Sequence, residues 1–230
     1  MMGQAFAACS GQEEKMTTEE MLGRVDHTLL KPYATWEEIR RLCQEALEYH
    51  TASVCVPPSY VKRIHETYGG LNICTVVGFP LGYSTTGAKL AEVEQALAEG
   101  CNEIDMVVNI GDVKNGDFDK VERELRTLKE ACGGHILKVI IETCYLTLEE
   151  KIAMCRAVTN AGADYIKTST GFGTAGAARE DVELFRKHIG PEVKIKAAGG
   201  ISTLEELEMF IRLGCDRVGT SRAVGLCAKS

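Results

Sequence analysis

From about residue 25 onward, short runs of β-branched and other apolar residues alternate with longer amphipathic stretches. Runs of the first kind are typical of buried parallel strands, and stretches of the second kind are typical of helices. The runs predict eight strands, at residues 25–30, 52–56, 72–79, 103–109, 136–143, 165–170, 193–198 and 217–221. This repeated order, without a long linker or a break in composition, indicates parallel βαβ units in one domain.

Several amphipathic stretches carry a helix start signal. The residue pairs with the spacing of a capping box are Thr35 with Glu38, Thr147 with Glu150, and either Ser202 with Glu205 or Thr203 with Glu206. The glycines that follow helical stretches, where a left-handed C-cap would lie, are Gly100, Gly162, Gly190 and Gly214. These local signals agree with the strand pattern.

Eight strand–helix repeats in about 200 residues fit an α/β fold, namely a single-domain (β/α)8 TIM barrel. A doubly wound sheet is disfavoured because no GxGxxG follows the first strand. We expect the barrel to span residues 17–230 and residues 1–16 to form a flexible extension without a secretory signal. Active residues should then lie at the carboxyl ends of the strands or in the loops that follow them.

Composition narrows the function further. The 230 residues carry a formal net charge of −7, which argues against a general nucleic-acid binder, and no apolar run is long enough to span a membrane. The ten cysteines are scattered without a CxxC pair, which favours reduced thiols and a cytoplasmic location. The five histidines form no metal-binding cluster. We therefore expect neither a metal nor a cofactor.

Charged residues interrupt the predicted strands, although both faces of a barrel strand are normally apolar. They are Asp26, Asp105, Lys138, Glu142, Lys167, Lys194 and Lys196. Any one of them could be a strand-end charge that reaches solvent. Because a buried charge costs several kcal/mol unless it is paired, the whole set favours a functional site inside the barrel mouth.

Lys167 and Lys196 are the most informative pair, because they lie on consecutive strands at similar heights. Two ammonium groups a few ångströms apart disfavour each other, so one of the two pKa values is expected to fall. A neutral lysine can attack a carbonyl and form a Schiff base. Asp105 would either transfer protons in that chemistry or serve as a structural ion-pair partner.

Glycine-rich turns follow the last three predicted strands, at residues 170–173, 197–200 and 219–222. Backbone amides in such turns can approach a phosphate closely. Barrels commonly bind phosphate with the loops after strands seven and eight and a short extra helix, which "RAVGLCAK" could supply. The turns therefore predict a site for a small anionic ligand.

Eight short segments follow one another along the chain: "VDHTLLKP", "VCVPP", "VVGFPLG", "EIDMVVNIG", "LKVIIET", "IKTSTGF", "KAAGGI" and "VGTSRAV". In these segments and in their order, the sequence resembles the deoxyribose-phosphate aldolases of the short bacterial type over roughly residues 20–224. The resemblance implies a metal-independent class I aldolase on a TIM barrel, a lyase that reversibly cleaves 2-deoxy-D-ribose 5-phosphate to acetaldehyde and D-glyceraldehyde 3-phosphate. It also implies a homodimer or a homotetramer.

The resemblance further implies roles for individual residues. Lys167 would be the Schiff-base lysine, Lys196 the second lysine that lowers its pKa, and Asp105 the proton donor and acceptor. Asp26 and Lys138 would be supporting polar groups of the pocket. The phosphate would be held by Gly171, Gly199, Gly200, Gly219 and Ser221.

Two positions leave questions that the pattern does not answer. Some family members have a lysine that helps to hold the phosphate where this chain has Phe172, which bears on phosphate affinity and on tolerance of aldehydes without a phosphate. Cys55 has the strand parity of an inward-facing residue and is either a pocket thiol or, as we favour, a packed thiol.

Three other functions remain as alternatives. The first is another Schiff-base aldolase, such as a transaldolase-like enzyme. The second is a barrel that binds sugar phosphates without catalysis. The third is a metal-dependent aldolase, which the absence of a histidine cluster disfavours.

Overall fold

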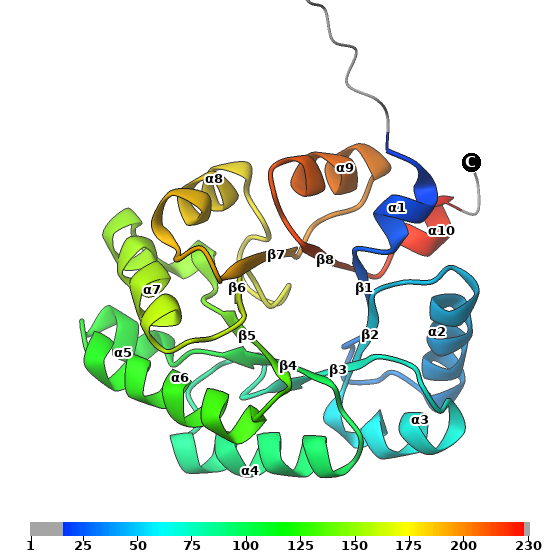
Figure 1. Ribbon diagram of the computed structural model, residues 1–230, viewed down its shortest axis with the longest axis horizontal. Coiled ribbons are helices and arrows are strands. Elements are labelled where there is room, and N and C mark those ends of the chain that lie inside the picture. Colours follow the sequence, from blue (N-terminus) through cyan, green and yellow to red (C-terminus); the bar gives the residue numbers. More distant parts are fainter. Residues whose placement is uncertain (1–15, 228–230) are drawn as a thin grey trace, which may run out of the picture.

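The computed structural model describes residues 16–227. Eight parallel strands close into a barrel in which each strand pairs with its neighbour in sequence and β8 pairs with β1 (Figure 1). The strands are β1 (Val25–Thr28), β2 (Ser53–Val56), β3 (Ile73–Val77), β4 (Glu103–Val107), β5 (Ile136–Ile140), β6 (Tyr165–Lys167), β7 (Lys194–Ala198) and β8 (Arg217–Thr220). The predicted (β/α)8 barrel is confirmed.

Helices surround this barrel (Figure 1). The α-helices are α1 (Thr18–Leu22), α2 (Trp36–Glu48), α3 (Val61–Thr67), α4 (Thr86–Ala98), α5 (Ile110–Lys114), α6 (Phe118–Cys132), α7 (Leu148–Asn160), α8 (Arg179–His188), α9 (Leu204–Arg212) and α10 (Ala223–Cys227). Short 3-10 turns, η1 (Pro58–Tyr60) and η2 (Thr143–Tyr145), follow β2 and β5. Of the expected N-terminal extension, only Met16 lies within the described residues, and it packs against the core. None of the helices in the described residues is both long and apolar enough to cross a membrane.

Several strands end earlier than their apolar pattern suggests. The fifth and sixth strands end at Ile140 and Lys167, so Glu142 lies beyond β5 in a loop and not in the strand. Its backbone has a φ of 51°, which is incompatible with a strand. Thr170, which was expected at the end of the sixth strand, donates its N–H to the Glu142 carboxylate instead of to a neighbouring strand. At the barrel mouth, hydrogen bonds to polar side chains therefore replace the backbone hydrogen bonds between neighbouring strands.

The predicted capping boxes are present at Thr35, Thr147 and Thr203, so Thr203 and not Ser202 is the N-cap of the last of these helices. The glycines with the expected left-handed backbone are Gly100, Gly162 and Gly214. At Gly190 the expectation was wrong, because its φ is not positive. Gly190 is needed for close packing instead, since a Cβ there would lie 2.5 Å from the Thr159 methyl carbon.

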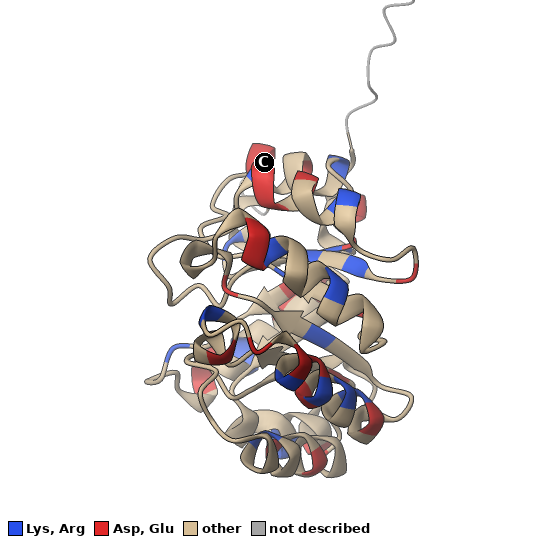
Figure 2. Cartoon of the chain, turned by 90° about the vertical axis from the view of Figure 1, so that its left-hand side faces the viewer, with Lys and Arg blue, Asp and Glu red and all other residues tan. Residues whose placement is uncertain are grey.

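The barrel separates an apolar layer from a polar interior. Side chains between the strands and the helices form the hydrophobic core, while acidic and basic residues are interspersed over the outer helices (Figure 2). Inside the barrel, the register places Asp105 of β4 opposite Lys138 of β5, and Lys167 of β6 opposite Lys196 of β7. Closure of the sheet therefore gathers these four charges inside the barrel, whereas Lys194, the first residue of β7, is exposed.

A further buried cation, Lys89, lies outside the barrel, between α4, α6 and β4. Lys89 is fully buried, and its Nζ donates to the Val107 carbonyl and to Glu124 Oε2, both at 2.8 Å. Gly78 makes room for this side chain, because a Cβ there would lie 2.8 Å from Lys89 Cε. The ion pair thus joins two helices to the end of a strand.

Replacing Glu124 with glutamine should lower the free energy of unfolding by about 3 kcal/mol, because the Lys89 ammonium would remain buried without a counter-charge. Urea denaturation monitored by circular dichroism measures this. The control is Glu183→Gln, which breaks the exposed Arg179–Glu183 pair on α8 and should leave the unfolding midpoint unchanged. Equal midpoints for the two variants would contradict the prediction.

Candidate active site

A cluster of seven charged side chains fills the centre of the barrel. Its members are Asp26 from β1, Glu103 and Asp105 from β4, Lys138 from β5, Lys167 from β6, Lys196 from β7 and Arg217 from β8. Six of them are buried, and the side chain of Arg217 is 17% exposed. We refer to these seven side chains as the barrel cluster.

Asp105 lies at the centre of the barrel cluster and contacts three lysines. Its Oδ2 is 2.6 Å from Lys167 Nζ and 2.7 Å from Lys196 Nζ, and its Oδ1 is 2.9 Å from Lys138 Nζ. Burial alone would raise the pKa of Asp105, but the three ammonium groups hold it well below its usual range. Asp105 is therefore a carboxylate at neutral pH, within hydrogen-bonding distance of both lysines predicted from the sequence.

Asp26 is a second buried carboxylate, and like Asp105 it contacts Lys196. Its Oδ2 is 2.5 Å from Lys196 Nζ, and its Oδ1 accepts hydrogen bonds of 2.8 Å from Ser53 Oγ and from Arg217. Burial opposes ionisation, but Lys196, Lys138 and Arg217 together hold the pKa of Asp26 well below its usual range. Asp26 thus gives Lys196 a second carboxylate partner in addition to Asp105.

The lysines differ in how many carboxylates they contact. Lys196 contacts Asp26 and Asp105, and Lys138 contacts these two at 3.6 and 2.9 Å and Glu103 at 2.6 Å. Burial alone would lower the pKa values of Lys196 and Lys138, but the carboxylates raise both above the usual range. Lys167 forms its ion pair with Asp105. Lys196 and Lys138 are therefore the lysines that stay protonated.

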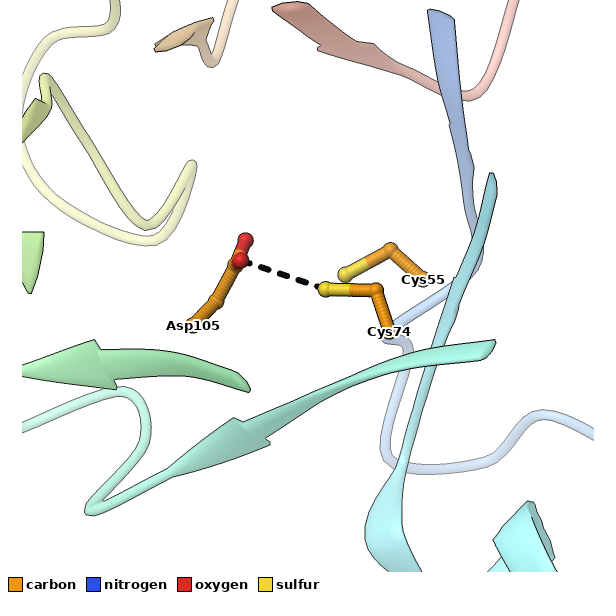
Figure 3. A group of neighbouring side chains, drawn as sticks. All are labelled: Cys55, Cys74 and Asp105. Carbon is orange, nitrogen blue, oxygen red and sulfur yellow. Dashed lines mark hydrogen bonds between the residues drawn. The ribbon is translucent and has the colours of Figure 1, made fainter. Parts of the chain in front are cut away.

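Two thiols lie beside this cluster on neighbouring strands. Cys55 and Cys74 are register partners on β2 and β3, and both point toward Asp105 (Figure 3). Cys74 Sγ donates to Asp105 Oδ1 at 3.1 Å, and the pKa of Cys55 is lowered, chiefly by its hydrogen bond with Cys74. Cys55 is fully buried and does not line the pocket described below, which agrees with a packed thiol.

The ligand atoms of Cys55, Cys74 and Asp105 lie within 4.8 Å of one another, and those of Asp26, Cys74 and Glu103 do as well. Two thiols and a carboxylate are suitable zinc ligands in principle. However, the carboxylates of both groups are already held by ammonium or guanidinium groups, which would repel a divalent cation. These donor sets therefore do not fit a metal, and we assign none.

A pocket of about 370 Å³ opens above the barrel cluster, at the carboxyl ends of the strands. It is lined by residues 28–31, Lys167, residues 170–172, residues 198–202 and residues 219–222. All five residues predicted to hold a phosphate are in this lining, and Lys167 is the member of the barrel cluster that reaches it. Asp26, Asp105, Lys138 and Lys196 lie beneath its floor. The structure thus brings the predicted catalytic and phosphate-binding residues to one place.

Glycines give this pocket its shape. Gly171, Gly199 and Gly200 have φ values of 85°, 88° and 79°, which side-chain-bearing residues rarely adopt. A Cβ on Gly219 would lie 3.2 Å from Lys196 Cε, so this glycine also leaves space for the lysine below. The glycine turns therefore expose backbone groups to the pocket and leave room for the charged side chains beneath it.

The loop after β6 is held by a carboxylate that the sequence analysis placed in a strand. Glu142 is buried and accepts hydrogen bonds from the N–H and the hydroxyl of Thr170. Thr170 Oγ1 in turn accepts the N–H of Phe172 at 2.9 Å. The Phe172 ring is half exposed and packs edge-on against Phe79, with ring centroids 5.4 Å apart. Phe172 thus forms an aromatic wall of the pocket.

Four charged residues of the site were not assigned a role from the sequence. Lys31 and Arg222 line the pocket directly after β1 and β8, and Glu103 and Arg217 are the first residues of β4 and β8. Lys31 and Arg222 could have been found from their positions after strands. Glu103 and Arg217 begin strands, where a charge usually reaches solvent, although Glu103 has the same strand parity as Asp105 and could have been expected to point inward with it.

Comparisons with known proteins agree with this geometry. Residues 18–227 match the family described as DeoC/LacD family aldolase. The chain is 70% identical over 212 residues to a deoxyribose-phosphate aldolase of Clostridium botulinum, covering 92% of this chain and 96% of that protein. It is 60% identical over 210 residues to the enzyme of the same name from Streptococcus pyogenes, covering 91% of this chain and 94% of that protein.

A solved structure shows the same fold. The deoxyribose phosphate aldolase of Aeropyrum pernix, described as tetrameric, superposes with a TM-score of 0.86 and 31% identity, covering 93% of this chain and 92% of that chain. Three findings lead to one conclusion. They are the closed barrel, the lysines that contact Asp105 at the base of a glycine-lined pocket, and the family match over almost the whole chain. The chain is an aldolase and belongs to the DeoC/LacD family.

Proposed function

We propose that this enzyme reversibly cleaves 2-deoxy-D-ribose 5-phosphate to acetaldehyde and D-glyceraldehyde 3-phosphate through a Schiff base on Lys167. The observation that carries the proposal is the position of the Lys167 amine, which lines the pocket and contacts the buried carboxylate Asp105 at 2.6 Å. A substrate carbonyl in the pocket would meet this amine before any other group of the barrel cluster.

The charges of the cluster favour a neutral amine. It contains four cationic side chains and three carboxylates, so release of one proton would balance the charges of these seven side chains. Lys196 and Lys138 are each fixed between two or more carboxylates, and arginine does not lose its proton in proteins. Lys167 has fewer carboxylate contacts and faces the pocket. It is therefore the lysine that can act as the nucleophile.

The reaction begins when neutral Lys167 attacks C1 of the open-chain sugar. Asp105 and a water molecule transfer the protons that turn the carbinolamine into an iminium ion, and protonated Lys196 beside Asp105 serves as a further proton donor and acceptor. The iminium accepts the electron pair of the C2–C3 bond while the C3 hydroxyl loses its proton and C3 becomes the aldehyde carbon of the leaving fragment. Glyceraldehyde 3-phosphate leaves, and protonation and hydrolysis of the remaining enamine release acetaldehyde.

The phosphate would bind at the glycine turns of the pocket. Gly171, Gly199, Gly200, Gly219 and Ser221 all line this pocket. Lys31 and Arg222 supply positive charge in the same lining, which also includes Phe172. These two cations would balance the phosphate.

Three further expectations belong to the same proposal. A relative is described as tetrameric, and we expect this chain to form a homodimer or homotetramer. We also expect a cytoplasmic enzyme that acts in the catabolism of deoxyribose phosphate. Finally, we expect residues 17–230 to form the catalytic domain by themselves.

Replacing Lys167 with leucine should abolish covalent trapping by borohydride in the presence of deoxyribose 5-phosphate, because no amine would meet the carbonyl. Intact-protein mass spectrometry measures the adduct, and the exposed Lys187→Met variant is the control that should trap fully. Full trapping in the Lys167→Leu variant would overturn the assignment. A wild-type adduct without acetaldehyde release would indicate a different Schiff-base aldolase, and binding without any adduct would indicate a non-catalytic protein.

Replacing Arg222 with methionine should raise KM for deoxyribose 5-phosphate by about tenfold or more, because a charge-assisted contact to phosphate is worth about 1.5–3 kcal/mol. The same variant should cleave deoxyribose without a phosphate at the wild-type rate. A coupled assay for acetaldehyde with both substrates separates the two effects. An equal loss with both sugars would show that Arg222 does not act on the phosphate.

A further inference from the structure

Glu103 and Arg217 lie at the end of the barrel opposite the pocket and touch neither Lys167 nor the pocket lining. Arg217 Nη1 is 2.8 Å from Asp26 Oδ1 and 3.2 Å from Glu103 Oε2. Glu103 Oε2 is in turn 2.6 Å from Lys138 Nζ. These contacts attach both residues to the base of the barrel cluster.

Two chains of ion pairs connect this base to the pocket. One runs from Arg217 through Asp26 and Lys196 to Asp105, and the other runs from Glu103 through Lys138 to Asp105. Both chains meet on the carboxylate that contacts Lys167 at 2.6 Å. A change of charge at the base therefore reaches Lys167 through buried groups, where solvent screening is weak.

We propose that Arg217 and Glu103 are positioning residues that set, from opposite directions, how readily Lys167 loses its proton. The proposal rests on the function of Lys167 proposed above. Arg217 adds the fourth cation to a cluster with three carboxylates, and Glu103 is one of those carboxylates. The surplus of positive charge, and hence the tendency of one lysine to be neutral, depends on both residues.

The titratable and charged groups that face the barrel interior come from all eight strands. They are Asp26, Cys55, Cys74, Glu103, Asp105, Lys138, Tyr165, Lys167, Lys196 and Arg217. The Cys55 thiol could also release a proton to relieve the surplus. The test must therefore follow Lys167 itself and not only a pH profile of activity.

The direction of each change follows from charge alone. Without the Arg217 guanidinium, the positive charge of the cluster falls and the Lys167 ammonium becomes easier to hold, so its deprotonation moves to higher pH. Without the Glu103 carboxylate, the positive charge rises and the deprotonation moves to lower pH. Each shift of the Lys167 deprotonation midpoint should be on the order of one pH unit. This is the size expected when a unit charge is removed about one layer of side chains away from Lys167, at an effective dielectric constant of about 20.

The experiment compares wild type with Arg217→Gln, Glu103→Gln and the double variant. Acetic anhydride labels neutral amines, and the labelling of Lys167 is followed against pH by peptide mass spectrometry, with exposed Lys187 as the internal reference. We expect the Lys167 midpoint to rise in Arg217→Gln, to fall in Glu103→Gln, and to return to within a few tenths of a unit of wild type in the double variant. The acid limb of kcat/KM should move in the same directions.

A merely structural role gives a different result. It would lower kcat in both single variants without opposite shifts, and absent shifts or shifts in one direction would overturn the proposal. If Arg217→Gln does not fold, Arg217→Lys takes its place in the comparison with Glu103→Gln, because it keeps the positive charge. The midpoint must then fall in Glu103→Gln and stay in place in Arg217→Lys. Failure of wild-type Lys167 to form a borohydride adduct would refute the proposed function instead, so the two failures are distinguishable.

Discussion

The contact of the Asp105 carboxylate with the amines of three lysines is the interaction on which the barrel interior depends. A buried carboxylate is costly without partners, and so are buried ammonium groups. Together they stabilise one another, because each oxygen of Asp105 is within 2.9 Å of an amine. The arrangement fixes the relative heights of β4, β5, β6 and β7, since a one-residue slip would turn these side chains to the other face.

The inside of the barrel has two levels, a charged floor and a ligand pocket above it. The floor is a closed network of charges in which Asp26 and Asp105 hold Lys196 from two sides. The level above it is a pocket lined largely by backbone, with glycines at Gly171, Gly199 and Gly200 and positive charge at its edge. Lys167 belongs to both levels. Its amine is oriented by the floor and faces the ligand space of the pocket, as a Schiff-base nucleophile requires.

Much of this was predictable from the sequence, because each strand is buried on both faces and therefore appears as an apolar run. A lysine or an aspartate in such a run stands out, which identified Lys167, Lys196 and Asp105 before their distances were known. Strand ends were less predictable. The apolar pattern continues beyond β5, but the left-handed backbone at Glu142 ends the strand and allows its carboxylate to hold Thr170. Gly190 was misread because close packing and a helix cap both select glycine.

From the amino-acid sequence alone, one can predict the order of strands and helices, the starts of several helices, and the residue types able to form a Schiff base. Local hydrogen bonding and side-chain periodicity determine these features, and both are visible along the chain. The tertiary structure alone decided the charge balance of the site. Arg217 and Asp26 are 191 positions apart and meet only because β8 closes against β1. Lys31 and Arg222 enter one pocket for the same reason, since closure of the barrel brings the first and last loops together.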